Sequence, residues 1–203
     1  GDEQADRFGQ LLTPVVNAFL PDRGLEGAVM AQQVLGGDGY VKELGVEQIV
    51  RDARIAQIYE GANGIQALDL AGRKVVRDGG KTLTELLDVL AQYEIDPEHQ
   101  TQVTEAFARL LRASQSMVAR SNEDANLPGA VSSDFLDLMG MTLCAWAWGV
   151  MAHQAGNDDF GLAKKQTARF FFARLLPRTL GLEQSILANS DVLMDMPEAL
   201  FNA

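Results

Sequence analysis

The chain is poor in cysteine and in basic residues. Its only cysteine, Cys144, lies in an apolar stretch, so the sequence offers neither a disulfide framework nor a zinc-binding cysteine pattern. Lys and Arg number 17 against 28 Asp and Glu, which gives a formal net charge of −11. Nucleic-acid backbones and anionic membrane surfaces attract concentrated positive charge, so neither is expected as a partner. A reducing cytoplasm is the location we predict.

Long apolar runs and strand patterns are also missing. No apolar run is expected to reach the ~18 residues of a membrane span, and the N-terminus has no signal-peptide pattern. The alternation of apolar and polar residues that marks strands is absent. Apolar residues recur instead every three or four positions, which is the spacing of one face of a helix. The sequence therefore predicts an all-α protein made of helical bundles.

Proline and glycine set the predicted helix boundaries. Helices are expected over residues 7–35, 46–54, 64–77, 82–93, 97–122, 132–156 and 160–187. Pro14 and Pro21 should bend the first of them. Asn63 is the predicted N-cap of the third, and residues 127–129 are predicted to form a loop. Gly79 and Gly80 mark a boundary that divides the chain into residues 1–80 and 81–203.

One carboxylate stands out because of its position. Glu60 lies between a helical segment and a glycine-rich turn, in Arg51-Asp-Ala-Arg-Ile-Ala-Gln-Ile-Tyr-Glu-Gly-Ala-Asn-Gly64. A carboxylate there can act as a general base if it is held close to its substrate and shielded from water. The local pattern alone leaves open that Glu60 is a solvated turn residue beside a helix N-terminus.

A second segment upstream is rich in glycine. Gln33-Val-Leu-Gly-Gly-Asp-Gly39 ends an apolar helical pattern in three glycines, where a backbone can come close to a phosphate-bearing ligand. Ordinary helix termination explains these glycines equally well.

The two segments together resemble the C-terminal helical domain of the flavin-dependent acyl-CoA dehydrogenases. A later run, Ala163-Lys-Lys-Gln-Thr-Ala-Arg-Phe-Phe-Phe-Ala-Arg-Leu-Leu-Pro177, resembles the helical domain appended to larger members, including those acting on methylthio-propionyl thioesters. The resemblance implies that residues 1–80 are part of the first domain and residues 81–203 are an appended four-helix domain. It also implies that Glu60 removes the α-proton of an acyl-CoA while a hydride leaves the β-carbon for FAD, which yields the trans-2-enoyl-CoA.

The resemblance implies roles for the neighbours of Glu60 as well. Tyr59 and Gly61 would lie at the substrate. Contacts with FAD are implied for Gln33, Val34, Leu35, Gly36, Gly37, Ala62, Asn63 and Gly64. The first five would reach FAD on a neighbouring subunit, so a homodimer or higher homo-oligomer is expected. The sequence departs from the commonest family pattern, Thr-x-Gln, at Ala62 and Gly64, so contacts there would depend on backbone groups.

The resemblance covers only the end of the family's architecture. The N-terminal helical domain and the flavin-holding β-domain are not in this sequence, so we expect the chain alone to be inactive. The parent enzyme would pass electrons to an electron-transfer flavoprotein; an acyl-CoA oxidase and a non-catalytic helical interaction or oligomerisation module are the alternatives. Without those neighbours, the first helix is expected to expose Leu11, Val15 or Phe19. His99 and His153 lie far apart without clustered carboxylates, so no metal site is expected.

Overall fold

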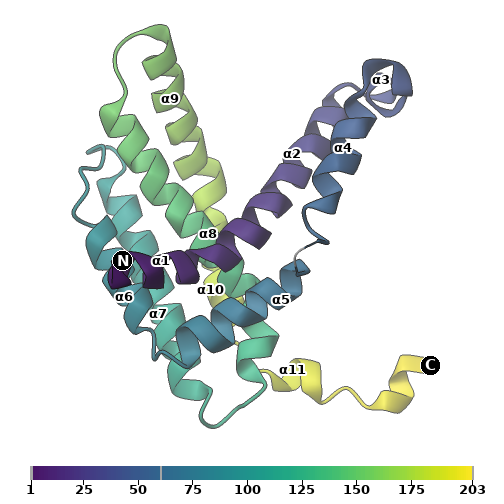
Figure 1. The fold of residues 1–203 in the computed structure, drawn as a ribbon, viewed down its shortest axis with the longest axis vertical. Helices are drawn as coiled ribbons and strands as arrows, with labels where there is room; N and C mark the ends of the chain where they lie inside the picture. Colours follow the sequence, from purple (N-terminus) through teal and green to yellow (C-terminus); the bar gives the residue numbers. More distant parts are fainter. Residues whose placement is uncertain (1, 60, 203) are drawn as a thin grey trace.

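The fold is a helical bundle with a projecting helical arm (Figure 1). The computed structural model describes residues 2–59 and 61–202, and no strand occurs among them, so the predicted all-α class is confirmed. The α-helices are α1 (Glu3–Pro14), α2 (Leu20–Val34), α3 (Gly37–Tyr40), α4 (Val46–Ile55), α5 (Asn63–Leu68), α6 (Lys81–Leu90), α7 (Gln100–Arg120), α8 (Leu127–Gln154), α9 (Asp159–Phe170), α10 (Thr179–Leu187) and α11 (Asp191–Met194). Three π-helical segments are η1 (Val15–Phe19), η3 (Asp69–Val76) and η4 (Phe171–Leu175), and three 3-10 segments are η2 (Lys42–Leu44), η5 (Leu176–Arg178) and η6 (Glu198–Asn202).

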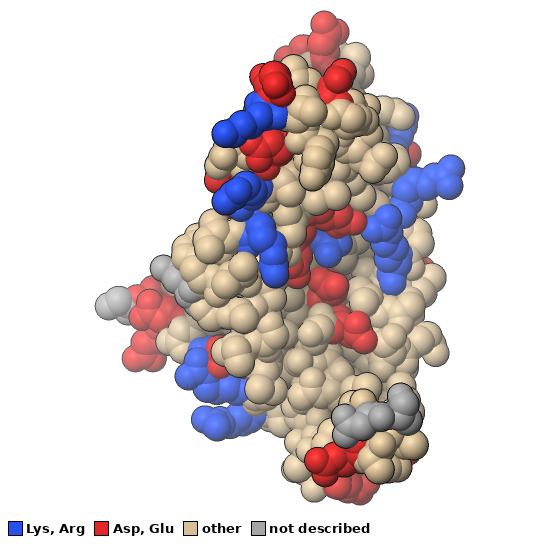
Figure 2. Space-filling model, turned by 90° about the vertical axis from the view of Figure 1, so that its right-hand side faces the viewer, with Lys and Arg blue, Asp and Glu red and all other residues tan. Residues whose placement is uncertain are grey.

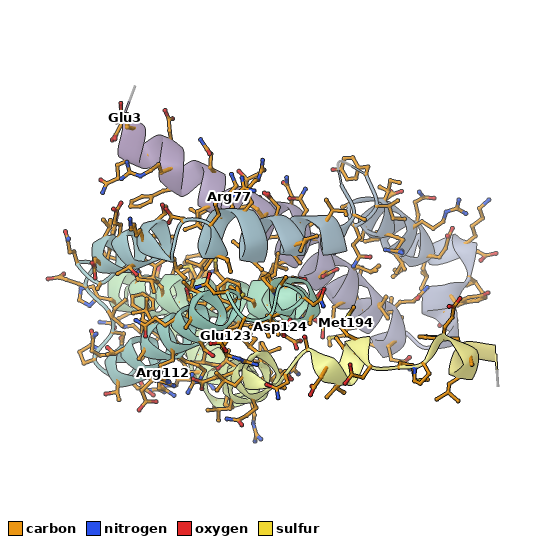
Figure 3. All side chains as sticks on the ribbon, turned by 90° about the horizontal axis from the view of Figure 1, so that it is seen from below. Glu3, Arg77, Arg112, Glu123, Asp124 and Met194 are labelled. Carbon is orange, nitrogen blue, oxygen red and sulfur yellow. The ribbon has the colours of Figure 1, made fainter. Side chains whose placement is uncertain are left out.

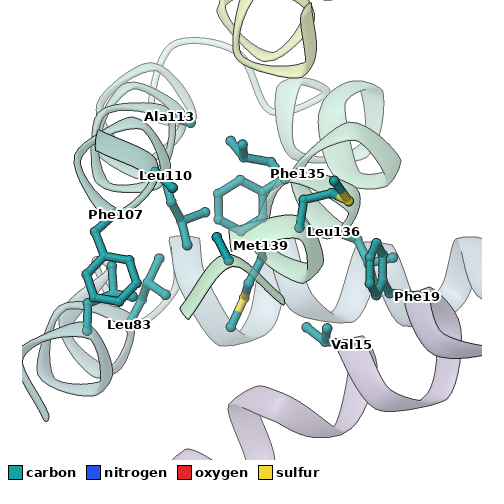
Figure 4. Close-up of a cluster of buried hydrophobic side chains, with 14 of the residues drawn as sticks. Val15, Phe19, Leu83, Phe107, Leu110, Ala113, Phe135, Leu136 and Met139 are labelled. Atoms are coloured by element: carbon teal, nitrogen blue, oxygen red, sulfur yellow. The ribbon is translucent and has the colours of Figure 1, made fainter. Parts of the chain in front are cut away.

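Helix α8 is the centre of the bundle. It packs against α5, η3, α7, α9 and α10, so helices from both ends of the sequence meet on it. Figure 4 shows the core that results, with Phe19 of η1, Leu110 of α7 and Phe135 of α8 in one cluster. This core contains residues from both sides of Gly80. The division into residues 1–80 and 81–203 stays a prediction from the sequence.

The first predicted helix is nearly continuous, as α1, η1 and α2. The π turn of η1 lies between Pro14 and Pro21, whose missing N–H groups interrupt α-helical hydrogen bonding. The expectation that this helix exposes Leu11, Val15 or Phe19 is wrong. All three are at most 4% exposed, because α1 and η1 turn this face onto the bundle.

Several predicted boundaries also need correction. Residues 127–129 form the first turn of α8, where Pro128 is tolerated because first-turn N–H groups have no partner within the helix. Helix α7 begins at Gln100, because Asp96 makes a separate turn in which its carboxylate accepts from the Glu98 N–H at 2.9 Å. The helix predicted over residues 160–187 is interrupted by the π segment η4 and by the 3-10 segment η5, which contains Pro177.

Helix α8 is long and apolar enough to cross a membrane, by length and composition alone. Its best window has a mean hydropathy of 1.4, although the sequence contains no uninterrupted apolar run of that length. Within the described part of the chain, 56% of this window is buried among the other helices. The central helix of a bundle meets the same criteria, and this is the role that α8 has here.

Charges of both signs are interspersed on the surface that carries the arm. Figure 2 shows Lys and Arg in small groups that alternate with Asp and Glu on the face that carries the arm, without merging into one basic area.

After α10, the C-terminal segment is fixed by Ser190 Oγ, which donates to Asp124 Oδ2. From there the C-terminal segment runs outward through Met194 (Figure 3).

Candidate active site

The two segments singled out in the sequence lie at opposite ends of the projecting arm. We define the α2–α4 arm as residues 20–55, in which α2 and α4 pack side by side and α3 forms the tip (Figure 1). Gln33 to Gly37 lie at the tip, and the segment from Tyr59 to Gly64 lies at the root, where α4 leads into α5. Helix α4 has ten residues, so about 15 Å of helix separates the two segments.

The tip presents an open glycine backbone. Gln33, Val34, Leu35, Gly36 and Gly37 are all exposed. Gly36 has a φ of 59°, a value that glycine adopts easily, and a β-carbon at position 36 or 37 would meet no atom within 4 Å. This uncovered backbone fits the close approach of a phosphate-bearing group such as the pyrophosphate of FAD.

Gly39 in the same segment has a different role. A β-carbon there would lie 2.5 Å from the Gln32 carbonyl oxygen. The Gln32 side chain also donates from Nε2 to the Gly39 carbonyl at 3.1 Å. Gly39 therefore allows α3 to pack closely on the end of α2, and it is buried.

At the root of the arm, Glu60 itself lies outside the described residues, and its neighbours are described. Tyr59 is 55% exposed. Gly61 is exposed and has a φ of 95°, a conformation that residues with a side chain rarely adopt. Ala62 is exposed and precedes the first turn of α5. Gly61 therefore bends the chain between α4 and α5 in a conformation that depends on glycine.

The prediction that Asn63 is the N-cap of the following helix is wrong. Ala62 occupies the cap position, and Asn63 is the first residue of α5. The Asn63 side chain is directed at the start of the arm, where Nδ2 donates to Asp22 Oδ1 at 2.5 Å and to the Ala18 carbonyl at 3.4 Å. Its Oδ1 is buried and has no hydrogen-bond partner among the described residues. The side chain therefore links α5 to α2.

Gln57 completes this link, and neither Gln57 nor Asp22 was predicted from the sequence. Gln57 Nε2 also donates to Asp22 Oδ1, and Gln57 Oε1 accepts from Arg54 Nη1 at 2.6 Å. Asp22 precedes Gln57 by 35 positions and Asn63 by 41. Local sequence patterns carry no signal for contacts at such separations, so only the three-dimensional arrangement reveals them.

Elsewhere, the structure brings Asp96, Glu98 and His99 together. Their ligand atoms lie within 4.8 Å of one another, so the statement that His99 has no carboxylates near it is wrong. Both carboxylate oxygens of Glu98 accept from Arg169, at 2.8–3.0 Å, and these hydrogen bonds lower the pKa of Glu98 below its usual range. His99 stacks on Phe172 with ring centroids 4.1 Å apart. These contacts join the start of α7 to α9 and η4 and account for the cluster.

Two known protein-family models match this chain. A family model described as "Acyl-CoA dehydrogenase, C-terminal domain" matches residues 2–75, and one described as "Acetyl-CoA dehydrogenase C-terminal like" matches residues 80–197. The second match alone covers more than half of the chain. The chain belongs to the acyl-CoA dehydrogenase family.

Individual relatives agree with this assignment. A 3-methylmercaptopropionyl-CoA dehydrogenase of Ruegeria pomeroyi is 32% identical over 94% of this chain and 35% of its own length. A broad-specificity linear acyl-CoA dehydrogenase of Mycobacterium tuberculosis is 26% identical over 97% of this chain and 36% of its own length. The mitochondrial short-chain specific acyl-CoA dehydrogenase of Bos taurus is 60% identical over 42 residues, which is 21% of this chain and 10% of its own length. The chain spans about a third of the length of the first two relatives.

Proposed function

We propose that this chain supplies the catalytic base of an FAD-dependent acyl-CoA dehydrogenase, and that the base is Glu60. The observation that carries the proposal is the turn at the root of the arm. In this member of the family, the turn carries a single carboxylate next to Gly61, whose positive φ sharpens the turn. Gln57 before it and Asn63 after it are tied to α2 by hydrogen bonds. A base has to be held within hydrogen-bond reach of the proton that it removes, and such a turn can do this.

The chemistry assigned to the chain is one proton transfer. The Glu60 carboxylate accepts the proton from the carbon next to the thioester carbonyl, and the double bond forms as a hydride leaves the β-carbon. FAD, when bound, accepts that hydride. Gly61 has no side chain and leaves space for the thioester, and the exposed ring of Tyr59 can line the path of the acyl chain.

The tip of the arm is proposed to hold FAD through Gln33, Val34, Leu35, Gly36 and Gly37. Its open backbone suits the pyrophosphate, and its distance from the root supports a contact with FAD held mainly by a neighbouring copy. The arm also exposes large apolar side chains, among them Met30 at 54% and Ile49 at 58%. Such surfaces are usually covered by another protein element, which supports a homodimer or higher homo-oligomer.

At the root, FAD contacts are proposed for Ala62, Asn63 and Gly64 through backbone groups. The Asn63 side chain is engaged by Asp22, and Ile65 and Gln66 donate to the Ala62 carbonyl, so the backbone N–H groups proposed to face FAD are those at the very start of α5. Turnover is proposed for the enzyme that contains this chain; the 203 residues alone are proposed to be colourless and inactive. A preparation with stoichiometric flavin absorbance would contradict this.

The base assignment is tested by Glu60→Gln in the FAD-containing enzyme. The amide keeps the size of the side chain and cannot accept the α-proton, so acyl-CoA should bind and the flavin should stay oxidised. We expect flavin reduction in stopped flow to slow by roughly 10²–10⁴-fold. Glu47→Gln, at the start of α4, should leave the rate unchanged. Reduction of Glu60→Gln at the wild-type rate would overturn the assignment.

The electron acceptor needs a separate experiment. An electron-transfer flavoprotein is the acceptor we propose, and an oxidase is the alternative. Turnover with an artificial acceptor and without hydrogen peroxide supports the dehydrogenase. Stoichiometric peroxide would identify an oxidase.

A further inference from the structure

The carboxylate of Asp22 contacts both ends of the segment that carries Glu60. Gln57 precedes Glu60 by three residues and Asn63 follows it by three. The side-chain amide of each donates to the same oxygen, Asp22 Oδ1, and the Asn63 Nδ2 distance is 2.5 Å. One atom on α2 therefore fixes the entry and the exit of the turn.

The two amides are themselves held in orientation. Gln57 Oε1 accepts from Arg54 Nη1 at 2.6 Å, which leaves its NH₂ group facing Asp22. Asn63 Nδ2 also donates to the Ala18 carbonyl at 3.4 Å, at the junction of η1 and α2. Asp22, Gln57 and Asn63 are all partly buried. Hydrogen bonds to a charged acceptor are stronger than neutral ones, and reduced contact with water strengthens them further.

The residue type at position 22 fits this task. A carboxylate is an acceptor only, so its oxygen can take two N–H donors whatever its rotation. An asparagine at position 22 would keep one acceptor oxygen and lose the charge. An alanine would leave the NH₂ groups of Gln57 and Asn63 without their shared acceptor.

We infer that Asp22 is a positioning residue for the proton transfer: it holds Gln57 and Asn63, the described residues three positions before and after Glu60, by accepting a hydrogen bond from each. The inference rests on the proposed function, because it needs Glu60 to be the base. It adds a residue on α2, far from Glu60 in the sequence, to those that the reaction requires. Displacing a reacting group by about 1 Å can cost 10²-fold in rate, so a change that frees the turn should act on catalysis directly.

The first test does not depend on activity. Amide hydrogen exchange is measured on the full chain carrying Asp22→Ala, Asp22→Asn or Glu26→Ala. The amides of Tyr59 and Ile65, which donate to the Ile55 and Ala62 carbonyls, report on the two ends of the turn. In Asp22→Ala they should exchange about tenfold faster or more, and in Asp22→Asn by less, while amides of α8 keep their protection.

Glu26→Ala is the control for this measurement. Glu26 lies one helical turn after Asp22 and pairs with Arg23 at 2.8 Å, so the variant also removes a carboxylate from α2. It should leave the turn unchanged. If Asp22→Ala also loses protection in α8, the whole protein is destabilised. The exchange of the Tyr59 and Ile65 amides is then compared in Asp22→Asn and Gln57→Ala instead. Unchanged exchange at Tyr59 and Ile65 in a folded variant would overturn the inference.

The second test uses the FAD-containing enzyme. Asp22→Ala should lower kcat by about 10–100-fold per bound flavin, with little change in KM, and Asp22→Asn should recover part of the loss. A purely structural role would reduce the amount of folded enzyme and leave kcat per bound flavin unchanged. The double variant Asp22→Ala with Glu60→Gln should be no slower than Glu60→Gln alone, because one residue acts through the other.

The two possible failures are distinguishable. If Glu60→Gln keeps the wild-type rate, the proposed function fails. If Glu60→Gln is slow and Asp22→Ala keeps the wild-type kcat, only the positioning role of Asp22 fails.

Discussion

Gly140 of α8 lies directly against the ring of Phe19 in η1. A β-carbon at position 140 would be 2.4 Å from Phe19 Cγ, which is closer than any real contact. Phe19 is 2% exposed and belongs to the core, so an added β-carbon would have to displace its ring. This contact is where η1, which leads into the α2–α4 arm, rests on the central helix of the bundle.

Gly140→Ala should therefore destabilise the protein by about 1–3 kcal/mol, because an extra carbon in a packed core forces its neighbours to shift. The measurement is urea unfolding followed by circular dichroism. Gly181→Ala is the control, since Gly181 is an exposed helical residue with no atom within 4 Å of an added β-carbon. That change should stabilise α10 by up to about 1 kcal/mol. Equal effects of the two substitutions would contradict the packing argument.

Glu183 of α10 should be far more sensitive to truncation than a surface glutamate. It is 7% exposed and accepts from Arg112 at 2.8–2.9 Å, and Arg109, also largely buried, lies 3.4 Å away. Removing one partner leaves buried charge without compensation, so Glu183→Ala should cost about 3 kcal/mol in the free energy of unfolding.

The comparison for this prediction is Glu85→Ala. Glu85 pairs with Arg7 at the same distance, 2.8 Å, but both side chains are nearly half exposed. An exposed pair contributes about 0–1 kcal/mol, so this variant should unfold almost like the wild type. Similar losses in both variants would show that burial is not what makes the Glu183 contacts important.

Asp137 of α8 should make stability depend on pH. Burial raises its pKa above the usual value of 3.8, with Asp22 nearby adding to the effect and Arg23 opposing it. The folded protein then holds this proton more tightly than the unfolded chain does. The contribution of Asp137 to stability is therefore complete below the pKa that it has in the unfolded chain. This contribution is lost as the pH rises through the higher pKa that it has in the folded protein.

Asp137→Asn should remove this dependence and be more stable than the wild type at pH 7. Unfolding free energies of both proteins are measured at intervals between pH 3 and pH 8. The difference should shrink as the pH falls toward the unfolded pKa. A difference that stays constant across the range would mean that Asp137 titrates alike in both states.

Gly61 and Gly64, which follow Glu60 in the sequence, should differ in their tolerance of alanine. Gly61 has a φ of 95°, and a β-carbon there would lie 3.1 Å from Gln66 Nε2, so Gly61→Ala should cost about 1–3 kcal/mol locally. Gly64 lies in α5 with free space around it, so Gly64→Ala should be tolerated. Amide exchange at Ile65 measures the local effect. Faster exchange only in Gly64→Ala would contradict the assigned turn geometry.

The sequence was most informative where local rules act alone. The three-and-four spacing of apolar residues predicts the helices, and the predicted short helix 46–54 differs from α4 by a single residue at its end. Proline was less informative, because it is compatible with several structures. Pro128 lies in the first turn of a helix that was predicted to begin later, and Pro14 is accommodated by a π turn within a continuous helix.

Contacts between distant residues account for the other differences. The sequence contains no reason to bury Leu11, Val15 and Phe19, because the surface that covers them comes from helices later in the chain. The orientation of Asn63 is a similar case. Asparagine is a good N-cap residue by local preference, and here the Asp22 carboxylate draws its side chain away from that role. The roles of Glu60 and of the glycines at the tip stay predictions.

The arm's length has a mechanical consequence. Helix α2 has 15 residues and is therefore about 22 Å long, and among the described residues it meets the bundle near its start. A tilt of about 10° at that end would move the glycines at the tip by about 4 Å, more than the length of a hydrogen bond. Phe19 and Asp22 lie at the end of the arm about which it would tilt. A small displacement of their side chains would therefore move Gly36 and Gly37 by a larger distance.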